Sequence, residues 1–249
     1  MKALQLHRWD LTTAEAREVQ LRMRERMIRT DAISQNSSAS TKSGNRRIRL
    51  VAGADVALVL SGPRGWEKGE GSAVAGVVVY TFPEMQEIER ASAVLPLTFP
   101  YVPGLLSFRE IPVLLAAFEQ LRNEPEVIFC DGQGYAHPRR FGLACHLGVL
   151  LDCPSIGVAK SVLIGEYREP ARRAGSTSLL RDPKSGETLG AALRTADGVK
   201  PVYVSPGHRI SLPTAVKLVH AVSNGYRIPR PTRDADHFVR TLRRSMATK

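Results

Sequence analysis

Three apolar, β-rich segments follow one another early in the chain, and this succession limits the possible folds more than any other feature. They cover residues 49–59, 73–82 and 86–95. Turn-forming residues separate them, and consecutive strands joined in this way are typical of an antiparallel meander. The segments therefore predict a β-sheet that begins with three antiparallel strands.

After these strands the pattern changes to helices that alternate with short apolar strands. The predicted helices are 109–122, 138–151, 211–223 and 232–244, and the predicted strands are 126–130, 154–159, 189–195 and 200–204. Helices that connect strands pack on the faces of the sheet. The alternation therefore predicts an α/β protein whose mixed sheet is covered on both faces.

A polar helix and a stretch of small polar residues precede the sheet. Residues 11–29 are rich in strong helix formers, and Asp10 or Thr12 is placed to cap that helix. Residues 30–45 are dominated by Ser, Thr, Asn and Gly without any period, which is typical of a flexible linker or a surface loop. We expect a single domain over residues 1–249, with 30–45 as a linker or loop after the N-terminal helix.

The charge balance indicates what kind of partner the protein could bind. The 249 residues carry a formal net charge of +11, and 43% of them are hydrophobic, which is enough for a full core. An excess of positive charge favours nucleic acid as the partner, although a basic protein without such a partner fits the charge equally well. The longest apolar stretches fall far short of the roughly 18 residues of a transmembrane helix, and the N-terminus has no signal-peptide pattern.

The cysteines indicate a reducing compartment. Cys130, Cys145 and Cys153 are three in number and have no CxxC spacing. Neither a disulfide framework nor a zinc site is expected from such a set. A cytoplasmic location fits this pattern.

Acidic residues occupy positions that are unusual for surface charges. Asp55 lies inside an apolar strand, Asp131 directly follows the apolar segment 127–130, and Glu110 opens a predicted helix. A buried carboxylate must be paired, hydrogen-bonded or bound to a metal, and ligands collect at the carboxyl ends of strands. Three carboxylates on three elements could converge on one hard cation such as Mg²⁺.

Each carboxylate also has a purely structural interpretation. Glu110 has the Ser-x-x-Glu spacing of a capping box, although Pro112 favours a helix start nearer Arg109. Asp131 could bond the amides of its own turn, and Asp55 could pair with one of the many arginines. Spacing alone does not decide between these interpretations and a metal site.

The segment 131–140, DGQGYAHPRR, combines glycines with basic residues. Pro138 suits the first position of a helix, and a helix N-terminus flanked by Arg139 and Arg140 would bind phosphate. His137 could bind a phosphate or assist a water. It could equally bond the backbone at the start of the helix.

Two further features belong to the same edge of the sheet. Lys160 ends the strand that follows, which places it near Asp131, although a lysine there could simply be a solvated strand end. Gly132 and Gly134 allow close backbone approach. Their spacing lacks the third glycine of the dinucleotide-binding fingerprint, so it is only a weak signature of a dinucleotide site.

The loop 99–106 contains two prolines that bracket an aromatic residue and a valine. Proline fixes φ, so Pro100 and Pro103 stiffen the tip formed with Tyr101 and Val102. A stiff apolar tip is suited to insertion between bases. The alternative is a rigid loop whose Tyr101 packs on the core.

Three long motifs, taken together, resemble one nuclease family. They are FPYVPGLLSFRE (99–110), CDGQGYAHPRRFGLACHLGVLLDCPSIGVAKSVLIG (130–165) and YVSPGHRISLPTA (203–215). Together with LHRWDLTTAEA near the N-terminus and RIPRPTRDAD near the C-terminus, they resemble endonuclease V, the deoxyinosine-specific DNA repair nuclease. The resemblance covers nearly the whole chain.

The resemblance implies a fold and an activity. The fold is ribonuclease H-like, with a mixed five-stranded sheet flanked by helices. The implied reaction uses Mg²⁺, or Mn²⁺ in its place, to cleave the second phosphodiester bond 3′ to deoxyinosine, leaving 3′-hydroxyl and 5′-phosphate ends. The implied partner is double- or single-stranded DNA containing deoxyinosine, with inosine RNA as an alternative, and neither a membrane nor an obligate protein partner is expected.

The resemblance also assigns site residues. Catalytic roles fall on Asp55, Glu110, Asp131, His137 and Lys160. Metal ligands fall on Asp55, Glu110, Asp131 and Asp236. The wedge beside the extruded base falls on Pro100, Tyr101, Val102 and Pro103, and the lesion pocket on Leu106, Gly132, Gln133 and Gly134. Phosphate contacts are expected from Arg139 and Arg140.

Two other functions remain open at this point. One is a related nuclease that acts on inosine in RNA or on branched or mismatched DNA. The other is a basic nucleic-acid-binding protein with an inactive nuclease fold. The presence of Asp55, Glu110 and Asp131 argues against the inactive protein.

Overall fold

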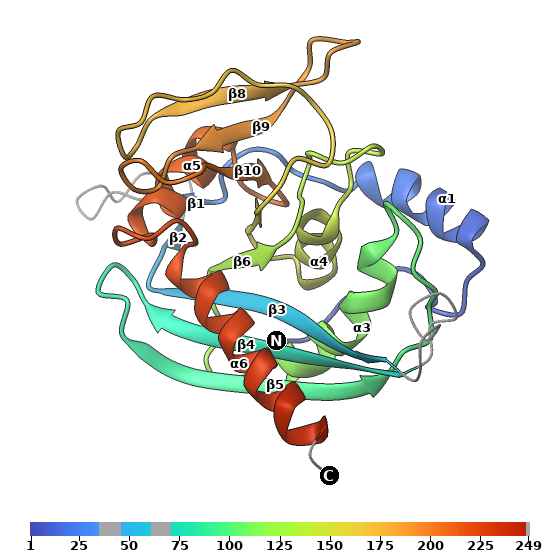
Figure 1. Ribbon diagram of the computed structural model, residues 1–249. Helices are drawn as coiled ribbons and strands as arrows, with labels where there is room; N and C mark the ends of the chain where they lie inside the picture. The colour runs from blue at the N-terminus through green and yellow to red at the C-terminus, as the bar shows by residue number, and fades with distance from the viewer. Residues whose placement is uncertain (35–45, 61–70, 248–249) are drawn as a thin grey trace.

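The computed structural model describes residues 1–34, 46–60 and 71–247 (Figure 1). Its helices are α1 (Thr13–Arg24), α3 (Leu106–Glu119), α4 (Leu143–Leu151), α5 (Leu212–Ala221) and α6 (Arg230–Ala247). Its strands are β1 (Ile33–Ser34), β2 (Arg46–Arg47), β3 (Leu50–Leu60), β4 (Gly71–Thr81), β5 (Glu87–Pro96), β6 (Val127–Asp131), β7 (Ser155–Ala159), β8 (Thr177–Arg181), β9 (Thr188–Leu193) and β10 (Val202–Pro206). None of the helices in these ranges is long and apolar enough to cross a membrane.

The main sheet confirms the predicted α/β class. Its strand order is β5-β4-β3-β6-β7-β10-β9-β8. The first three strands form the expected antiparallel meander, and β6 and β7 run parallel to β3. The sheet has eight strands rather than the five expected, because β10 pairs antiparallel with the edge of β7 and β9 and β8 continue from it. Within this sheet, the sequence pattern did not predict strand β8, and it did not predict the separate pair of β1 and β2 either.

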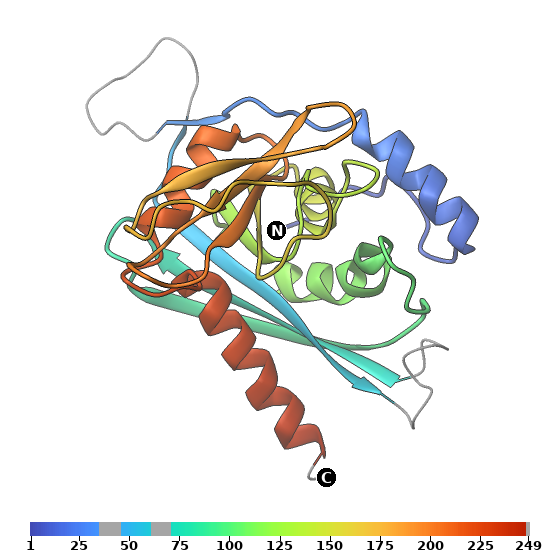
Figure 2. The ribbon, with the colours of Figure 1, turned by 45° about the horizontal axis from the view of Figure 1, so that its top comes forward.

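Helices cover both faces of this sheet (Figure 2). Side chains alternate along a strand, so Ala52 and Ala54 of β3 face one core while Val51 faces the other. Helices α1, α3 and α4 supply the first core, and α5 and α6 the second. In Figure 2, α3 and α6 lie on opposite sides of the long strands.

Helix α6 packs directly on the sheet because two strand residues lack side chains. A Cβ atom on Gly53 would lie 1.9 Å from the carbonyl oxygen of Pro231, and one on Gly76 would lie 2.7 Å from Cγ1 of Val239. Any larger residue at Gly53 would push the helix away. The close approach carries the middle of α6 onto the strand that holds Asp55.

The start of α1 agrees with the sequence prediction. Thr12 is the N-cap, and its side chain and that of Glu15 form a reciprocal capping box.

The start of helix α3 differs from the prediction. It begins at Leu106, so the predicted start near Arg109 is wrong. The capping-box interpretation of Glu110 is also wrong, because Ser107 lies inside the helix and its hydroxyl bonds Nδ1 of His146 at 3.0 Å.

Helix α4 begins later than predicted. It starts at Leu143 with Gly142 as its N-cap, so Pro138 is not in its first turn. Arg140 has φ of +57°, which interrupts any helical run through this segment. The helix therefore does not begin beside Arg139 and Arg140, as the phosphate-site prediction required, but after them at Leu143.

The predicted linker 30–45 falls largely outside the described residues, which resume at residue 46. Its first residues are part of the packed structure. The Asp31 carboxylate accepts hydrogen bonds from the amide and hydroxyl of Ser211 and from the hydroxyl of Thr214. Asp31 therefore secures the start of α5, whose N-cap is Ser211.

Candidate active site

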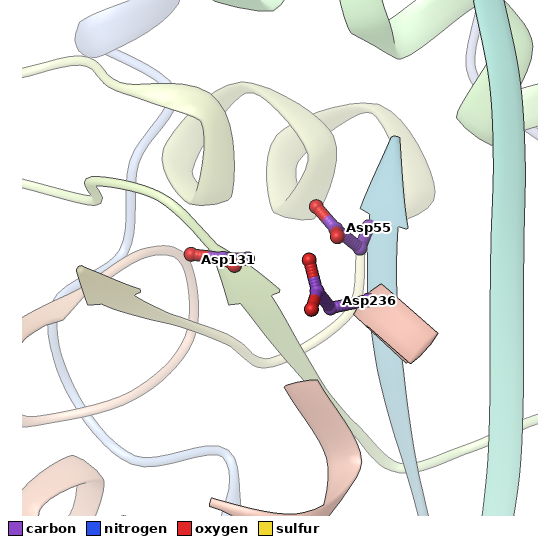
Figure 3. A group of neighbouring side chains, drawn as sticks. All are labelled: Asp55, Asp131 and Asp236. Atoms are coloured by element: carbon purple, nitrogen blue, oxygen red, sulfur yellow. The ribbon is translucent and has the colours of Figure 1, made fainter. Parts of the chain in front are cut away.

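Three carboxylates from distant parts of the chain meet on the α6 face of the sheet. Asp55 comes from β3, Asp131 from the end of β6 and Asp236 from α6, and their side chains point toward one another (Figure 3). One oxygen of each lies within 4.8 Å of the other two. Strands β3 and β6 are parallel neighbours in which Ala54 is opposite Cys130. The next residues, Asp55 and Asp131, therefore project from the same face of the sheet. Asp236 is added by the close packing of α6.

The cluster holds more negative charge than its neighbours compensate. Burial, followed by the charge of Asp131, raises the pKa of Asp55 to about 7. Burial also raises the pKa of Asp131, although Lys160 forms an ion pair with its carboxylate. Lys160 lies 4.0 Å from Asp236, which also pairs with Arg240 at 3.0 Å. Oxygen ligands that repel one another fit a hard divalent cation.

Glu110 approaches the cluster from α3. It is partly buried, and its pKa is raised well above its usual value by burial and then by the charges of Asp55 and Asp131. It is not one of the three residues whose oxygens lie within 4.8 Å of one another. Glu110 therefore lies beside the cluster, and its direct ligation of a metal remains a prediction.

Asp55→Asn is expected to stabilise the protein when metal is removed. The pKa of Asp55 is about 7 in the folded protein, against roughly 4 in an unfolded chain. Wild-type stability therefore falls as the pH rises from about 4 to about 7, because the carboxylate must ionise in a buried site. In EDTA at pH 8, the melting temperature of the variant should be higher than that of the wild type by roughly 5 °C.

The pH series supplies the control for this effect. The difference between the two proteins should shrink as the pH falls from about 7 to below about 4, where the carboxyl becomes protonated in both states. Adding Mg²⁺ should raise the melting temperature of the wild type more than that of the variant. A variant that melts lower than the wild type in EDTA at pH 8 would contradict the electrostatic account of the site.

A cavity of about 400 Å³ opens beside the carboxylates. Its walls come from Gln20 of α1, the loop before α3, the first turn of α3, the turn after β6, the start of α4 and the loop after β7. Asp131 lines it as well and so belongs to both the cavity and the carboxylate cluster, and its ion-pair partner Lys160 also lines the cavity. The volume lies within the range of small-ligand pockets and is sufficient for one nucleobase.

Three of the four residues predicted for the lesion pocket line this cavity. Leu106, Gly132 and Gln133 line the cavity. Gly134 does not. It is buried, its amide donates to the hydroxyl of Ser205, and a Cβ atom there would meet a backbone oxygen of Pro206 at 2.4 Å. Gly134 therefore serves close packing behind the pocket rather than the pocket wall.

The amide of Gln133 has a fixed orientation. Its Nε2 donates to the carbonyl of Ser161 at 3.0 Å, and its Oε1 is buried with no hydrogen-bond partner in the described part of the chain. Ser161, Val162 and Leu163 also line the cavity. These three residues were not predicted from the sequence, because a short loop after a strand carries no pattern that would mark it.

The loop formed by residues 100–103, which we call the wedge loop, projects its aromatic residue outward. The Tyr101 side chain is 47% exposed and lines the mouth of the cavity. The alternative in which Tyr101 packs in the core is therefore wrong. Its ring lies 6.0 Å from the guanidinium carbon of Arg109, and Val102 and Pro103 also line the cavity.

The basic residues of 131–140 bond mainly to the protein. His137 is buried, and its pKa is lowered to about 4 by burial and the charge of Arg139, so the ring is neutral at neutral pH. Arg140 pairs with Asp182 at 2.5 Å and with Glu187 at 2.8 Å. Burial gives His137 a structural role, and the two ion pairs give Arg140 one. The catalytic role of His137 and the phosphate contact of Arg140 remain predictions.

The order of β5, β4, β3, β6 and β7, with acidic residues on the two central parallel strands and on the C-terminal helix, defines the class of ribonuclease H-like nucleases. Comparisons identify the family within that class. A family model for endonuclease V matches residues 31–237. The chain belongs to the endonuclease V family, and the protein is an endonuclease.

Individual relatives agree with this assignment over nearly their full length. Endonuclease V of Trichormus variabilis is 46% identical over 236 residues, covering 95% of this chain and 97% of the relative. The crystal structure of endonuclease V from Streptomyces avermitilis has a TM-score of 0.83 at 41% identity, covering 97% of this chain and 96% of that one. The Ciona intestinalis enzyme, solved with a 24mer DNA containing an inosine followed by a ribo-adenosine, has a TM-score of 0.74 at 29% identity, with 94% and 98% covered.

Proposed function

We propose that this protein is a metal-dependent DNA repair endonuclease that recognises deoxyinosine, the product of adenine deamination. It cleaves the second phosphodiester bond 3′ to the lesion and leaves 3′-hydroxyl and 5′-phosphate ends. The observation that carries the proposal is that Asp131, a member of the carboxylate cluster, also lines the cavity together with its ion-pair partner Lys160. A base extruded into the cavity would bring the phosphates of its own strand to the carboxylates.

The chemistry follows from the donor set. Mg²⁺ or Mn²⁺ held by Asp55, Asp131 and Asp236, with Glu110 beside them, would polarise the scissile phosphate and lower the pKa of a bound water. Lys160 carries a positive charge next to Asp131 and stabilises negative charge that develops on the phosphate. The carboxylates orient the attacking water through their remaining lone pairs.

Base recognition is assigned to the fixed groups of the cavity. The Oε1 atom of Gln133 is held as an acceptor, because Nε2 of the same amide is committed to Ser161. Hypoxanthine has an N1–H donor, whereas adenine has an acceptor at N1. An oriented acceptor therefore favours the deaminated base. The Ciona intestinalis relative solved with DNA containing inosine supports this choice of lesion.

The rest of the molecule suits a DNA substrate in a reducing compartment. The net charge of +11 provides sequence-independent affinity for phosphates, in double- or single-stranded DNA. Cys130, Cys145 and Cys153 are free and buried, which fits the cytoplasm. The proposed function needs no obligate protein partner.

A panel of matched substrates tests the proposal. Oligonucleotides carrying inosine, uracil, an abasic site or no lesion are prepared as DNA and as RNA, and incubated with Mg²⁺, Mn²⁺ or EDTA. We expect cleavage of inosine DNA with either metal, none in EDTA, and products whose lengths and end groups match the second bond 3′ to the lesion. Equal cleavage of lesion-free DNA would overturn the lesion specificity, and preferential cleavage of inosine RNA would transfer the function to RNA.

A further inference from the structure

The carbonyl oxygen of Gly104, directly after the wedge loop, accepts three side-chain hydrogen bonds. Nε2 of Gln20 and Nε2 of His137 each donate to it at 3.0 Å, and Nη2 of Arg139 donates at 2.6 Å. A carbonyl oxygen has two lone pairs, so three donors saturate it. We call these three side chains the Gly104 clamp.

Gln20 is the member of the clamp that comes from the N-terminal helix. Its side chain is 1% exposed. Its Oε1 accepts from Nε of Arg139 at 2.5 Å, and its Nε2 also donates to the carbonyl of Phe141 at 3.2 Å. Both donors and the acceptor of the amide are used, so the side chain has one orientation, and removing it would leave buried polar groups unpaired.

His137 completes the network with a defined proton position. The backbone amide of Arg139 donates to Nδ1 of His137 at 3.2 Å. The neutral ring therefore carries its proton on Nε2, the atom that bonds the Gly104 carbonyl. Gln20, Arg139 and His137 thus form one connected set of hydrogen bonds around a single backbone oxygen.

The backbone at Gly104 transmits this restraint to the wedge loop. Gly104 has φ of +78°, and a Cβ atom there would lie 2.8 Å from Nη2 of Arg139, so the clamp requires glycine. The amide of Leu105 donates to the carbonyl of Val102 at 2.9 Å, which closes the turn on the other side. Any shift of the Gly104 carbonyl would therefore move Pro103 and the exposed Tyr101.

We propose that Gln20 is a positioning residue for opening the duplex: through the Gly104 clamp, helix α1 holds the wedge loop in the shape that separates the bases beside the lesion. The proposal rests on the proposed function. Extruding a base costs a few kcal/mol of stacking and pairing. A loop that is ordered before binding loses no further conformational entropy when it inserts. Single-stranded DNA has little stacking to replace, so the clamp matters for the duplex alone.

The test compares Gln20→Met with Gln120→Met, the same substitution at an exposed position at the end of α3. Affinity is measured with Ca²⁺ in place of Mg²⁺, on duplex and single-stranded DNA carrying deoxyinosine, with 2-aminopurine beside the lesion to report unstacking. Gln20→Met should weaken duplex binding about tenfold, the effect of leaving one buried hydrogen-bonding group unpaired. It should also reduce the fluorescence rise in the duplex, with single-strand affinity within about twofold of wild type. Gln120→Met should match the wild type on both substrates.

Equal losses on the two substrates, or an unchanged duplex signal, would overturn the positioning role. Melting temperatures are recorded for every variant. If Gln20→Met does not fold, Gln20→Glu, which places an acceptor opposite the Gly104 carbonyl, is measured with the same expectations. A wild type that does not discriminate deoxyinosine from undamaged DNA contradicts the proposed function, whereas discrimination by the wild type without a duplex-specific loss in the variant contradicts only the clamp.

Discussion

Asp131→Ala is expected to abolish cleavage of DNA containing deoxyinosine while the protein remains folded. Asp131 belongs to both the carboxylate cluster and the cavity wall, so its loss removes a metal ligand and the partner of Lys160. Replacing a residue that hydrogen-bonds a metal ligand typically lowers metal affinity or activity about 10- to 100-fold. Replacing a ligand itself should therefore lower the cleavage rate by more than about 100-fold. Cleavage rates at saturating Mg²⁺ and a thermal melt of the same preparation measure the two parts of this prediction.

The same loss is expected for Asp55→Ala and Glu110→Ala. Asp55 is a member of the cluster, and Glu110 lies close enough for the two other charges to raise its pKa. Asp10→Ala, at an exposed position, is the control and should cleave like the wild type. Substantial Mg²⁺-dependent cleavage by Asp131→Ala would refute the metal site, whereas activity in Glu110→Ala alone would confine the ligands to the three aspartates.

Tyr101→Ala is expected to weaken binding to duplex DNA containing deoxyinosine by about 5- to 150-fold. A stacked aromatic ring is worth roughly 1–3 kcal/mol per base, which offsets much of the cost of extruding the lesion. Binding to single-stranded DNA with the same lesion should change much less. Because the ring is 47% exposed, the melting temperature should stay near that of the wild type.

Tyr101→Phe is the matched control for the wedge. It keeps the aromatic face and removes only the hydroxyl, so its duplex affinity should remain near the wild-type value. Equal losses of affinity on duplex and single strand in Tyr101→Ala, together with a lower melting temperature, would show that the ring supports the fold instead. The Gln20→Met experiment separates the position of the loop from the stacking of its tip.

Local patterns in the sequence determined the strands and the face on which their acidic residues lie. Alternation with period two makes Asp55 and Asp131 project from the same side once β3 and β6 are paired in parallel. The two prolines around Tyr101 likewise predicted a stiff loop, and the ring is exposed as insertion requires. These features depend on neighbours in the chain, which is why a pattern of residues can predict them.

The tertiary structure decided which distant residues complete the site. No local pattern connects Asp236 to Asp55, and only the family resemblance implied that Asp236 is a metal ligand. The two meet because Gly53 and Gly76 let α6 pack directly on the sheet. Pairing of β10 with β7 enlarged the sheet, and Arg140 with positive φ moved the start of α4 from 138 to 143.

Gln20 shows the same limit most clearly. It sits in a polar, charge-rich helix, yet it is buried against the Gly104 carbonyl. Its burial depends on where α1 docks against two other segments. Such contacts are set by side-chain packing across the whole molecule and not by the spacing of residues along one element.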